Sequence, residues 1–152
     1  MMKISSLTRI LGALIFSLLG FSSCNKYSPC MYGTPSADFE VGGTVEDEAG
    51  NPVEGIRAIV KYKRNMPESE WNGDTLYTDD KGRYYRDLGS LFPGSCDELK
   101  VVFEDIDGEE NGGEFESKTV VGQKKQVKKG DGSWYSGAFE VTADAVLKKK
   151  TN

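Results

Sequence analysis

Histidine is absent from all 152 residues of the chain, and this absence excludes several classes of enzyme. Imidazole is the commonest general base near neutral pH and the commonest metal ligand in proteins. Without it, no catalytic triad of the serine–histidine–acid type can form. The sequence also lacks the nucleophile-elbow motif of the α/β-hydrolases. We therefore expect a protein that is not an enzyme and that needs no cofactor for catalysis.

Basic residues are also scarce relative to acidic ones. The chain has 19 lysines and arginines against 24 aspartates and glutamates, which gives a net charge of −5. Proteins that bind nucleic acid neutralise phosphates with clustered lysines and arginines. An acidic chain is therefore a poor candidate for that class of partner. Its length suits one domain of ordinary size.

Long apolar runs are missing except near the start, where residues 1–23 have the pattern of a secretory signal. Lys3 and Arg9 precede an apolar run at 10–21, which is shorter than the roughly 20 residues of a membrane span. Two serines then precede Cys24. This arrangement resembles the lipobox of bacterial lipoproteins, in which the cysteine is acylated and becomes the new N-terminus. The alternative is an ordinary signal peptide that leaves Cys24 unmodified.

A lipid on Cys24 would tie the chain to a membrane without spanning it. The expected location is the cell envelope, at the outer membrane, with the periplasmic and surface faces both open. Residues 24–37 are rich in proline, glycine and serine and read as a tether. Residues 38–150 are the expected domain. An exported chain enters a compartment that permits disulfides.

Alternating apolar and polar residues predict strands along the whole domain. Inward-facing sets recur with period 2, and turn residues separate them. The sets are Phe39, Val41, Gly43 and Val45; Ile56, Ala58, Val60 and Tyr62; Leu99, Val101 and Phe103; and Phe139, Val141, Ala143, Ala145 and Leu147. No window shows a helical stripe. We therefore expect an all-β fold, a single antiparallel Greek-key β-sandwich of about seven strands, transthyretin-like or immunoglobulin-like.

Two motifs in this domain resemble the carboxypeptidase regulatory-like domains. The first is a G-x-V-x-D-x-x-G-x-P-x-x-G pattern, matched by Gly43, Val45, Asp47, Gly50, Pro52 and Gly55. The second is matched by Thr78, Asp80 (one place late), Gly82 and Tyr84. In physical terms, Gly50 and Gly82 supply turn conformations and Tyr84 enters the core. The resemblance implies a transthyretin-like sandwich and no particular activity.

A second resemblance covers nearly the whole chain after the signal. The lipobox, the segment Cys30–Phe39, the sandwich opening and the acidic Asp-Ile-Asp-Gly segment occur in the order seen in lipoproteins that accompany radical SAM enzymes in Bacteroidetes-type bacteria. The resemblance implies that the chain is a substrate or partner of such a modifying enzyme. The segment to be modified would then be Cys30, Met31, Tyr32 and Gly33.

Cys30 has three competing interpretations. It can form a disulfide with Cys96, the other cysteine that follows Cys24, and this would join the tether to the domain. Closing so long a loop would stabilise the fold by about 4 kcal/mol in the chain-entropy model. It can instead be the site of enzymatic modification. It can also stay a free thiol or pair with another protein.

An acidic stretch at 105–116 contains four candidate calcium ligands, Asp105, Asp107, Glu109 and Glu116. Densely packed carboxylates suit Ca²⁺, which prefers hard oxygen ligands. An EF-hand is excluded because Glu110 occupies the position where the motif needs glycine, and because no helices flank the stretch. A looser calcium loop between strands remains one interpretation. A solvated acidic loop is the other.

Aromatic residues outside the expected core form a candidate sugar-binding platform, Trp71, Trp134 and Tyr135. Flat rings with polar tips suit stacking on sugars. The alternative is that they close the ends of the sandwich. Taken together, the sequence predicts a membrane-anchored, non-catalytic envelope lipoprotein that acts as an accessory or interaction module for an envelope partner. The alternative function is a calcium- or glycan-binding module of the cell surface.

Overall fold

The computed structural model describes residues 33–63 and 72–151, and within them the chain forms strands and no helix. The strands are β1 (Ser36–Asp47), β2 (Arg57–Tyr62), β3 (Asn72–Tyr77), β4 (Arg83–Leu91), β5 (Lys100–Glu104), β6 (Lys118–Val121), β7 (Gln123–Lys129), β8 (Tyr135–Thr142) and β9 (Ala145–Leu147). Accordingly, no helix in the described part of the chain is long and apolar enough to cross a membrane.

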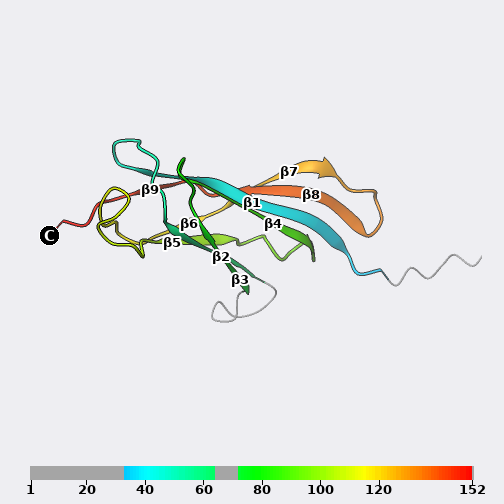
Figure 1. Cartoon of the computed structure of the whole chain (residues 1–152). Helices are drawn as coiled ribbons and strands as arrows, with labels where there is room; N and C mark the ends of the chain where they lie inside the picture. The colour runs from blue at the N-terminus through cyan, green and yellow to red at the C-terminus, as the bar shows by residue number, and fades with distance from the viewer. Residues whose placement is uncertain (1–32, 64–71, 152) are drawn as a thin grey trace, which may run out of the picture. The chain divides into compact units, whose positions relative to one another are not determined.

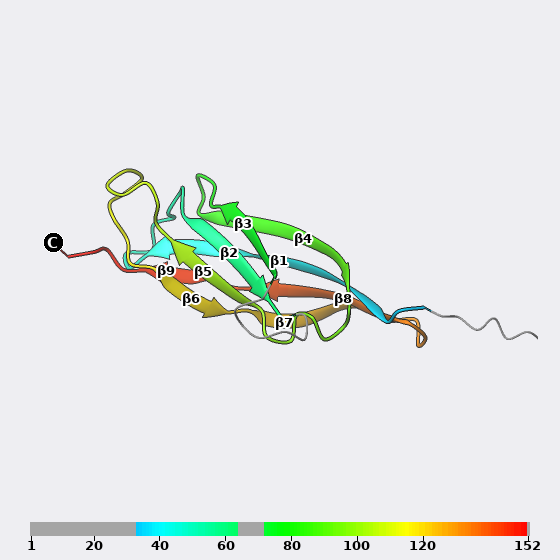
Figure 2. The ribbon, with the colours of Figure 1, turned by 90° about the horizontal axis from the view of Figure 1, so that it is seen from below.

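Two sheets pack face to face as a sandwich (Figure 1). The five-stranded sheet has the order β4-β1-β8-β7, and β9 pairs with the end of β1. The four-stranded sheet has the order β3-β2-β5-β6 (Figure 2). The expectation of an all-β sandwich is confirmed.

The alternation in the sequence becomes the core between the two sheets. Phe39, Val41 and Val45 point inward from β1 and are fully buried. They meet inward residues of the other strands: Ala58, Val60, Val101, Phe103 and Val141. Full burial of each such side chain contributes about 1.5–3 kcal/mol to the hydrophobic term of folding. The period-2 pattern therefore identified the buried face correctly.

The prediction of about seven strands, all antiparallel, is wrong in two respects. The described residues form nine strands, and β1 runs parallel to both β8 and β9. The sequence suggested one continuous last strand, which the structure divides between β8 and β9. The division lies where Gly43 approaches Ala143 so closely that an added Cβ would lie 2.5 Å from the Ala143 carbonyl oxygen. At this point the backbone N–H of Thr44 donates to the side-chain carboxylate of Asp144 at 2.8 Å. In a continuous strand, a backbone carbonyl would accept this hydrogen bond.

Two turns behave as the sequence predicted. Gly82 closes the turn between β3 and β4, and its N–H donates to the Asp79 carbonyl at 2.8 Å. Its φ of 66° lies in the left-handed region, and an added Cβ would lie 2.3 Å from the Val45 carbonyl oxygen. Glycine is therefore required there. Gly50 also has a positive φ, of 82°.

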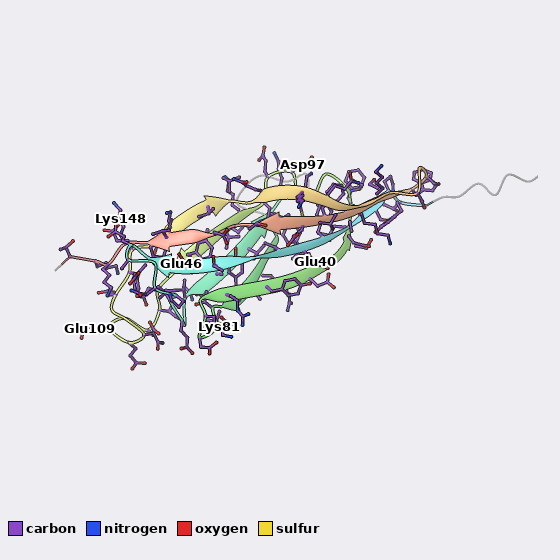
Figure 3. The ribbon with its side chains drawn as sticks, turned by 90° about the horizontal axis from the view of Figure 1, so that it is seen from above. Glu40, Glu46, Lys81, Asp97, Glu109 and Lys148 are labelled. Carbon is purple, nitrogen blue, oxygen red and sulfur yellow. The ribbon has the colours of Figure 1, made fainter. Side chains whose placement is uncertain are left out.

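The edge of the five-stranded sheet is charged. All seven residues of β7 are exposed, and Lys124, Lys125, Lys128 and Lys129 lie along it. Lys124 forms a salt bridge with Asp97, labelled at this edge in Figure 3. Charged edge strands discourage pairing with another chain. The lysines are therefore explained by protection of the edge.

The start of β1 is tied to the loop between β7 and β8. β1 begins at Ser36, whose N–H donates to the Trp134 carbonyl at 2.8 Å. The last residues of the predicted tether, 36 and 37, therefore belong to the sheet. The predicted signal segment and the lipidation site Cys24 lie outside the described residues.

Candidate functional site

An open groove of about 580 Å³ crosses the outer face of the five-stranded sheet. Figure 3 looks onto this face, with β1 between β8 and β4. Its lining comes from three adjacent strands and one turn: Gly42, Gly43 and Thr44 of β1; Arg83, Tyr84 and Tyr85 of β4; Glu140 and Thr142 of β8; and Asp79 of the β3–β4 turn. The pairing of these strands therefore creates the site.

The groove exists because Gly42 places no side chain on the outer face. Gly42 lies opposite Tyr85 on one side and opposite Thr142 on the other. An added Cβ at Gly42 would lie 3.6 Å from Cδ2 of Tyr85. The Tyr85 ring thus stands beside the hollow, and 60 % of this residue is exposed to solvent. Glycine inside a strand often marks a place where another group approaches the backbone.

An ion pair fixes one end of the groove. Nε and Nη2 of Arg83 both donate to Oδ2 of Asp79, at 3.0 and 2.8 Å. Oδ1 of the same carboxylate accepts the backbone N–H groups of Lys81 and Arg83 at 2.9 and 2.8 Å. The hydrogen bonds from Arg83 lower the pKa of Asp79 to about 2, and the carboxylate in turn raises the pKa of Arg83. The pair therefore stays ionised over the physiological range.

Carboxylates border the other end. Glu40, labelled in Figure 3, lies opposite Asp87 on β4 and opposite Glu140 on β8. Partial desolvation of Tyr85 raises the pKa of its phenol, and a hydrogen bond with Glu40 and the nearby negative charges add to this effect. The phenol therefore stays protonated at physiological pH, with its O–H directed to Glu40.

A smaller hollow of about 230 Å³ adjoins these carboxylates, with Asp38, Glu40 and Asp87 among its lining residues. The Tyr135 hydroxyl donates to Oδ2 of Asp38 at 2.8 Å, which occupies part of that carboxylate. Within residues 33–63 and 72–151, no group of three or more carboxylates or thiols is placed to hold a metal ion.

The predicted calcium ligands are not assembled into a site. Oδ1 of Asp105 accepts the N–H groups of Asp107 and Gly108, both at 3.1 Å, and Oδ2 accepts that of Phe115 at 2.7 Å. Partial burial pushes the pKa of Asp105 upward, but these hydrogen bonds outweigh it and lower the pKa. Asp105 thus holds its own loop together.

The three other proposed calcium ligands are also engaged elsewhere or point to solvent. Asp107 accepts a hydrogen bond from the Asn111 amide at 2.6 Å. Glu109 and Glu116 are exposed, and Figure 3 labels Glu109 on the loop. Within the described residues, this loop included, no group of three or more histidines, cysteines, aspartates or glutamates could hold a metal ion. Calcium binding at this loop stays a prediction.

The predicted aromatic platform is not the site that the structure shows. Trp134 lies half-exposed in the loop between β7 and β8, and Tyr135 is half-buried with its ring 5.6 Å from Nζ of Lys128. Neither residue lines the groove. Trp71 lies outside the described residues. The structure places the accessible ring of the groove at Tyr85 instead.

Of the three cysteines, the structure describes Cys96 but neither Cys24 nor Cys30. Only 1 % of the surface of Cys96 is exposed to solvent, and desolvation raises the pKa of its thiol to about 12. Cys30, Met31 and Tyr32 lie outside the described residues, and Gly33 is exposed. The Cys30–Cys96 disulfide and the modification of Cys30 both stay predictions.

Sequence reasoning missed the residues that define the groove. Neither Tyr85 nor Thr142 stands out in the sequence as a site residue. The one local signal was the pair Gly42–Gly43 inside a strand, because strand glycines are uncommon without a structural reason. That signal does not say which strands flank the glycines, so the site was not predictable from it.

Three solved structures similar to this fold are 1,2-dioxygenases. The 3-chlorocatechol 1,2-dioxygenase of Rhodococcus opacus 1CP is 12 % identical with a TM-score of 0.47, over 78 % of this chain and 61 % of that one. The catechol 1,2-dioxygenase of Pseudomonas arvilla C-1 is 12 % identical with a TM-score of 0.49, over 80 % and 55 %. The hydroxyquinol 1,2-dioxygenase of Pseudomonas putida DLL-E4 is 12 % identical with a TM-score of 0.49, over 95 % and 74 %.

The chain spans less than two thirds of the length of the first two of these enzymes. The likeness is one of distant architecture and carries no argument about activity. No family model matches the chain, and no curated protein matches its sequence. The predicted relationship to radical SAM-associated lipoproteins and to carboxypeptidase regulatory-like domains is therefore wrong, since the solved structures named here are dioxygenases and no family model supports the prediction.

Proposed function

We propose that this protein is a lipid-anchored, non-catalytic binding module of the cell envelope. The observation that carries this proposal is the groove of about 580 Å³ on the outer face of the five-stranded sheet. Its volume falls within the range of small-ligand sites, and three paired strands hold its walls. A groove on a rigid sheet face suits recognition, because its side chains need little reorganisation on binding.

The chemistry of the groove supports binding over catalysis. Proton transfer at neutral pH works best with a group whose pKa lies near 7. The pKa of Asp79 is held near 2 by Arg83, and the pKa of Tyr85 is raised from its already alkaline value. Both groups are therefore poorly matched to general acid–base work. They are suited to fixed roles as a charge pair and a neutral phenol.

The sequence supports the anchor. A basic start, a short apolar run and two serines precede Cys24. Lipid attached there would hold the sandwich through the segment that leads into β1. The groove would then be presented at a membrane surface, at the outer membrane of the envelope.

The test of the anchor is intact-mass spectrometry of the full chain expressed in a bacterium that processes lipoproteins. We expect loss of residues 1–23 and an acyl-sized mass gain on Cys24. The C24S variant should lack this mass and leave the membrane fraction. An unmodified Cys24 in the wild-type chain would contradict the lipid-anchored part of the proposal. It would leave the groove untouched.

A further inference from the structure

We infer that the groove beside Gly42 binds a neutral pyranose unit of a glycan, with Tyr85 as its stacking surface. This inference rests on the proposed binding function but not on the lipid anchor. It differs from the aromatic platform that the sequence suggested, since Trp134 and Tyr135 lie outside the groove.

The ring of Tyr85 supplies the apolar contact. Tyr85 is 60 % exposed on β4, an edge strand of the five-stranded sheet, and its Cδ2 would lie 3.6 Å from a Cβ added at Gly42, so the ring stands at the wall of the groove. A pyranose ring has a face of C–H groups that packs on an aromatic ring, while its hydroxyls project sideways. The hollow gives such a ring a place beside Tyr85, and Gly42 lets it approach the sheet backbone.

The polar lining offers both donors and acceptors, which neutral sugar hydroxyls need. Arg83 can only donate, Glu140 can only accept, and the hydroxyls of Thr44 and Thr142 can do both. Thr44 already donates to Asp144 at 3.1 Å, so its oxygen remains an acceptor. Glu140 and Thr142 are exposed on β8 and line the groove, so a ligand bound there would lie beside both groups.

The charge of the groove favours a neutral ligand over an anionic one. Arg83 at one end is neutralised by Asp79, and Glu140 at the other end lies next to Glu40. An anionic ligand would meet the carboxylate border, where Glu40 also lies opposite Asp87. A ligand with no net charge avoids this repulsion, and the cationic alternative is an arm of the test below.

The test is isothermal titration of the full chain, purified in a nonionic detergent without a sugar headgroup. The probes are cellotetraose, mannotetraose, chitotetraose and xylotetraose, with tetralysine as the cationic comparison. We expect at least one neutral oligosaccharide to bind. Y85A should weaken that binding about tenfold or more. The matched control is Y77A, because Tyr77 is 57 % exposed but lies on β3 of the other sheet.

A second variant tests the hydrogen bonds without removing the ring. T142V keeps the shape of the side chain and should weaken binding about fivefold, the effect of one lost hydrogen bond. The inference is overturned if no neutral oligosaccharide binds, or if Y77A weakens binding as much as Y85A. It is also overturned if tetralysine alone binds in a Tyr85-dependent way, an outcome that keeps the proposed binding function and changes the ligand. The mass of Cys24 tests the anchor separately.

Discussion

The hydroxyl of Tyr84 donates a hydrogen bond to the backbone carbonyl of Ala143 at 2.6 Å and so joins β4 to the break between β8 and β9. Tyr84 is buried, and its ring packs edge-on against Phe103 with centroids 5.5 Å apart. Burial, with a further contribution from the nearby charge of Asp144, raises the pKa of the phenol. The hydroxyl therefore stays protonated and remains a donor throughout the physiological range.

Replacing Tyr84 with phenylalanine should lower the free energy of unfolding by about 1–3 kcal/mol, because the Ala143 carbonyl loses its partner in a buried position. Urea denaturation followed by tryptophan fluorescence measures the change. The matched control is Y85F, which removes a hydroxyl from the exposed neighbour and should change stability by less than about 0.5 kcal/mol. If both variants lowered the free energy of unfolding equally, the buried hydrogen bond of Tyr84 would contribute no more to stability than the exposed hydroxyl of Tyr85.

The close approach of β1 to Ala143 predicts that G43A destabilises the fold. An added Cβ would lie 2.5 Å from the Ala143 carbonyl oxygen and 2.8 Å from its carbon, and both are backbone atoms with little freedom to move. We expect a loss of about 2–3 kcal/mol or more in unfolding free energy. G73A is the control, since a Cβ on Gly73 meets nothing closer than 3.7 Å. That variant should be neutral or more stable by about 0.4–1 kcal/mol.

The ion pair between Asp79 and Arg83 predicts a pH-dependent contribution to stability. The pKa of Asp79 falls from 3.8 to about 2 on folding, mainly through hydrogen bonds from Arg83. A depressed carboxylate pKa stabilises the folded state above the unfolded value, and this stabilisation is lost as pH falls through the folded value. We therefore expect the melting temperature of the wild type to exceed that of D79N at pH 7. This difference should shrink as the pH falls from about 4 to about 2.

The control for that experiment is D80N in the same turn. It removes the same charge but no hydrogen bond of the Asp79 carboxylate. Its melting temperature should stay closer to that of wild type at pH 7. If the difference in melting temperature between wild type and D79N were the same at pH 2 as at pH 7, the role of the ionised carboxylate would be contradicted.

The burial of Cys96 predicts a thiol that reacts only after unfolding. With its pKa raised to about 12 by desolvation, the thiol has almost no thiolate at pH 8. Reduced, folded protein should react with iodoacetamide at Cys96 at least about a hundredfold more slowly than protein in urea. Peptide mass spectrometry separates this site from the other cysteines. Fast alkylation of the folded protein would show that the loop opens.

The same labelling decides the disulfide predicted from the sequence. In protein isolated under oxidising conditions and unfolded without reductant, a Cys30–Cys96 bond would leave both cysteines unlabelled. Addition of reductant would then make both reactive. Labelling of Cys96 in urea without reductant would exclude that bond.

The core was predictable from the sequence because burial on a strand alternates with period 2. Phe39, Val41 and Val45 lie on the inner face as the pattern required. The same reasoning placed Tyr84 inside and Gly82 in a turn. In each case the information is local, since neighbouring residues along one strand determine which face is apolar.

The groove was not predictable because its walls come from strands far apart in the sequence. Gly42 meets Tyr85 and Thr142 only through the pairing of β1 with β4 and β8. No local pattern tells that β8 joins β1 in parallel, since an alternating strand suits either direction. The acidic loop is a second case, because its composition cannot tell that the Asp105 carboxylate accepts hydrogen bonds from backbone N–H groups of its own loop.

The parallel pairing of β1 with β8 and β9 also gives the domain a direction of mechanical resistance. The chain enters at the start of β1 and leaves after β9, at opposite ends of the sheet (Figure 1). Tension between these two points runs along the strands and loads their hydrogen bonds in shear. The bonds must then fail together, whereas a hairpin pulled from one end opens one bond at a time. A protein tethered ahead of β1 and pulled from its far end would therefore bear load along its stiffest axis.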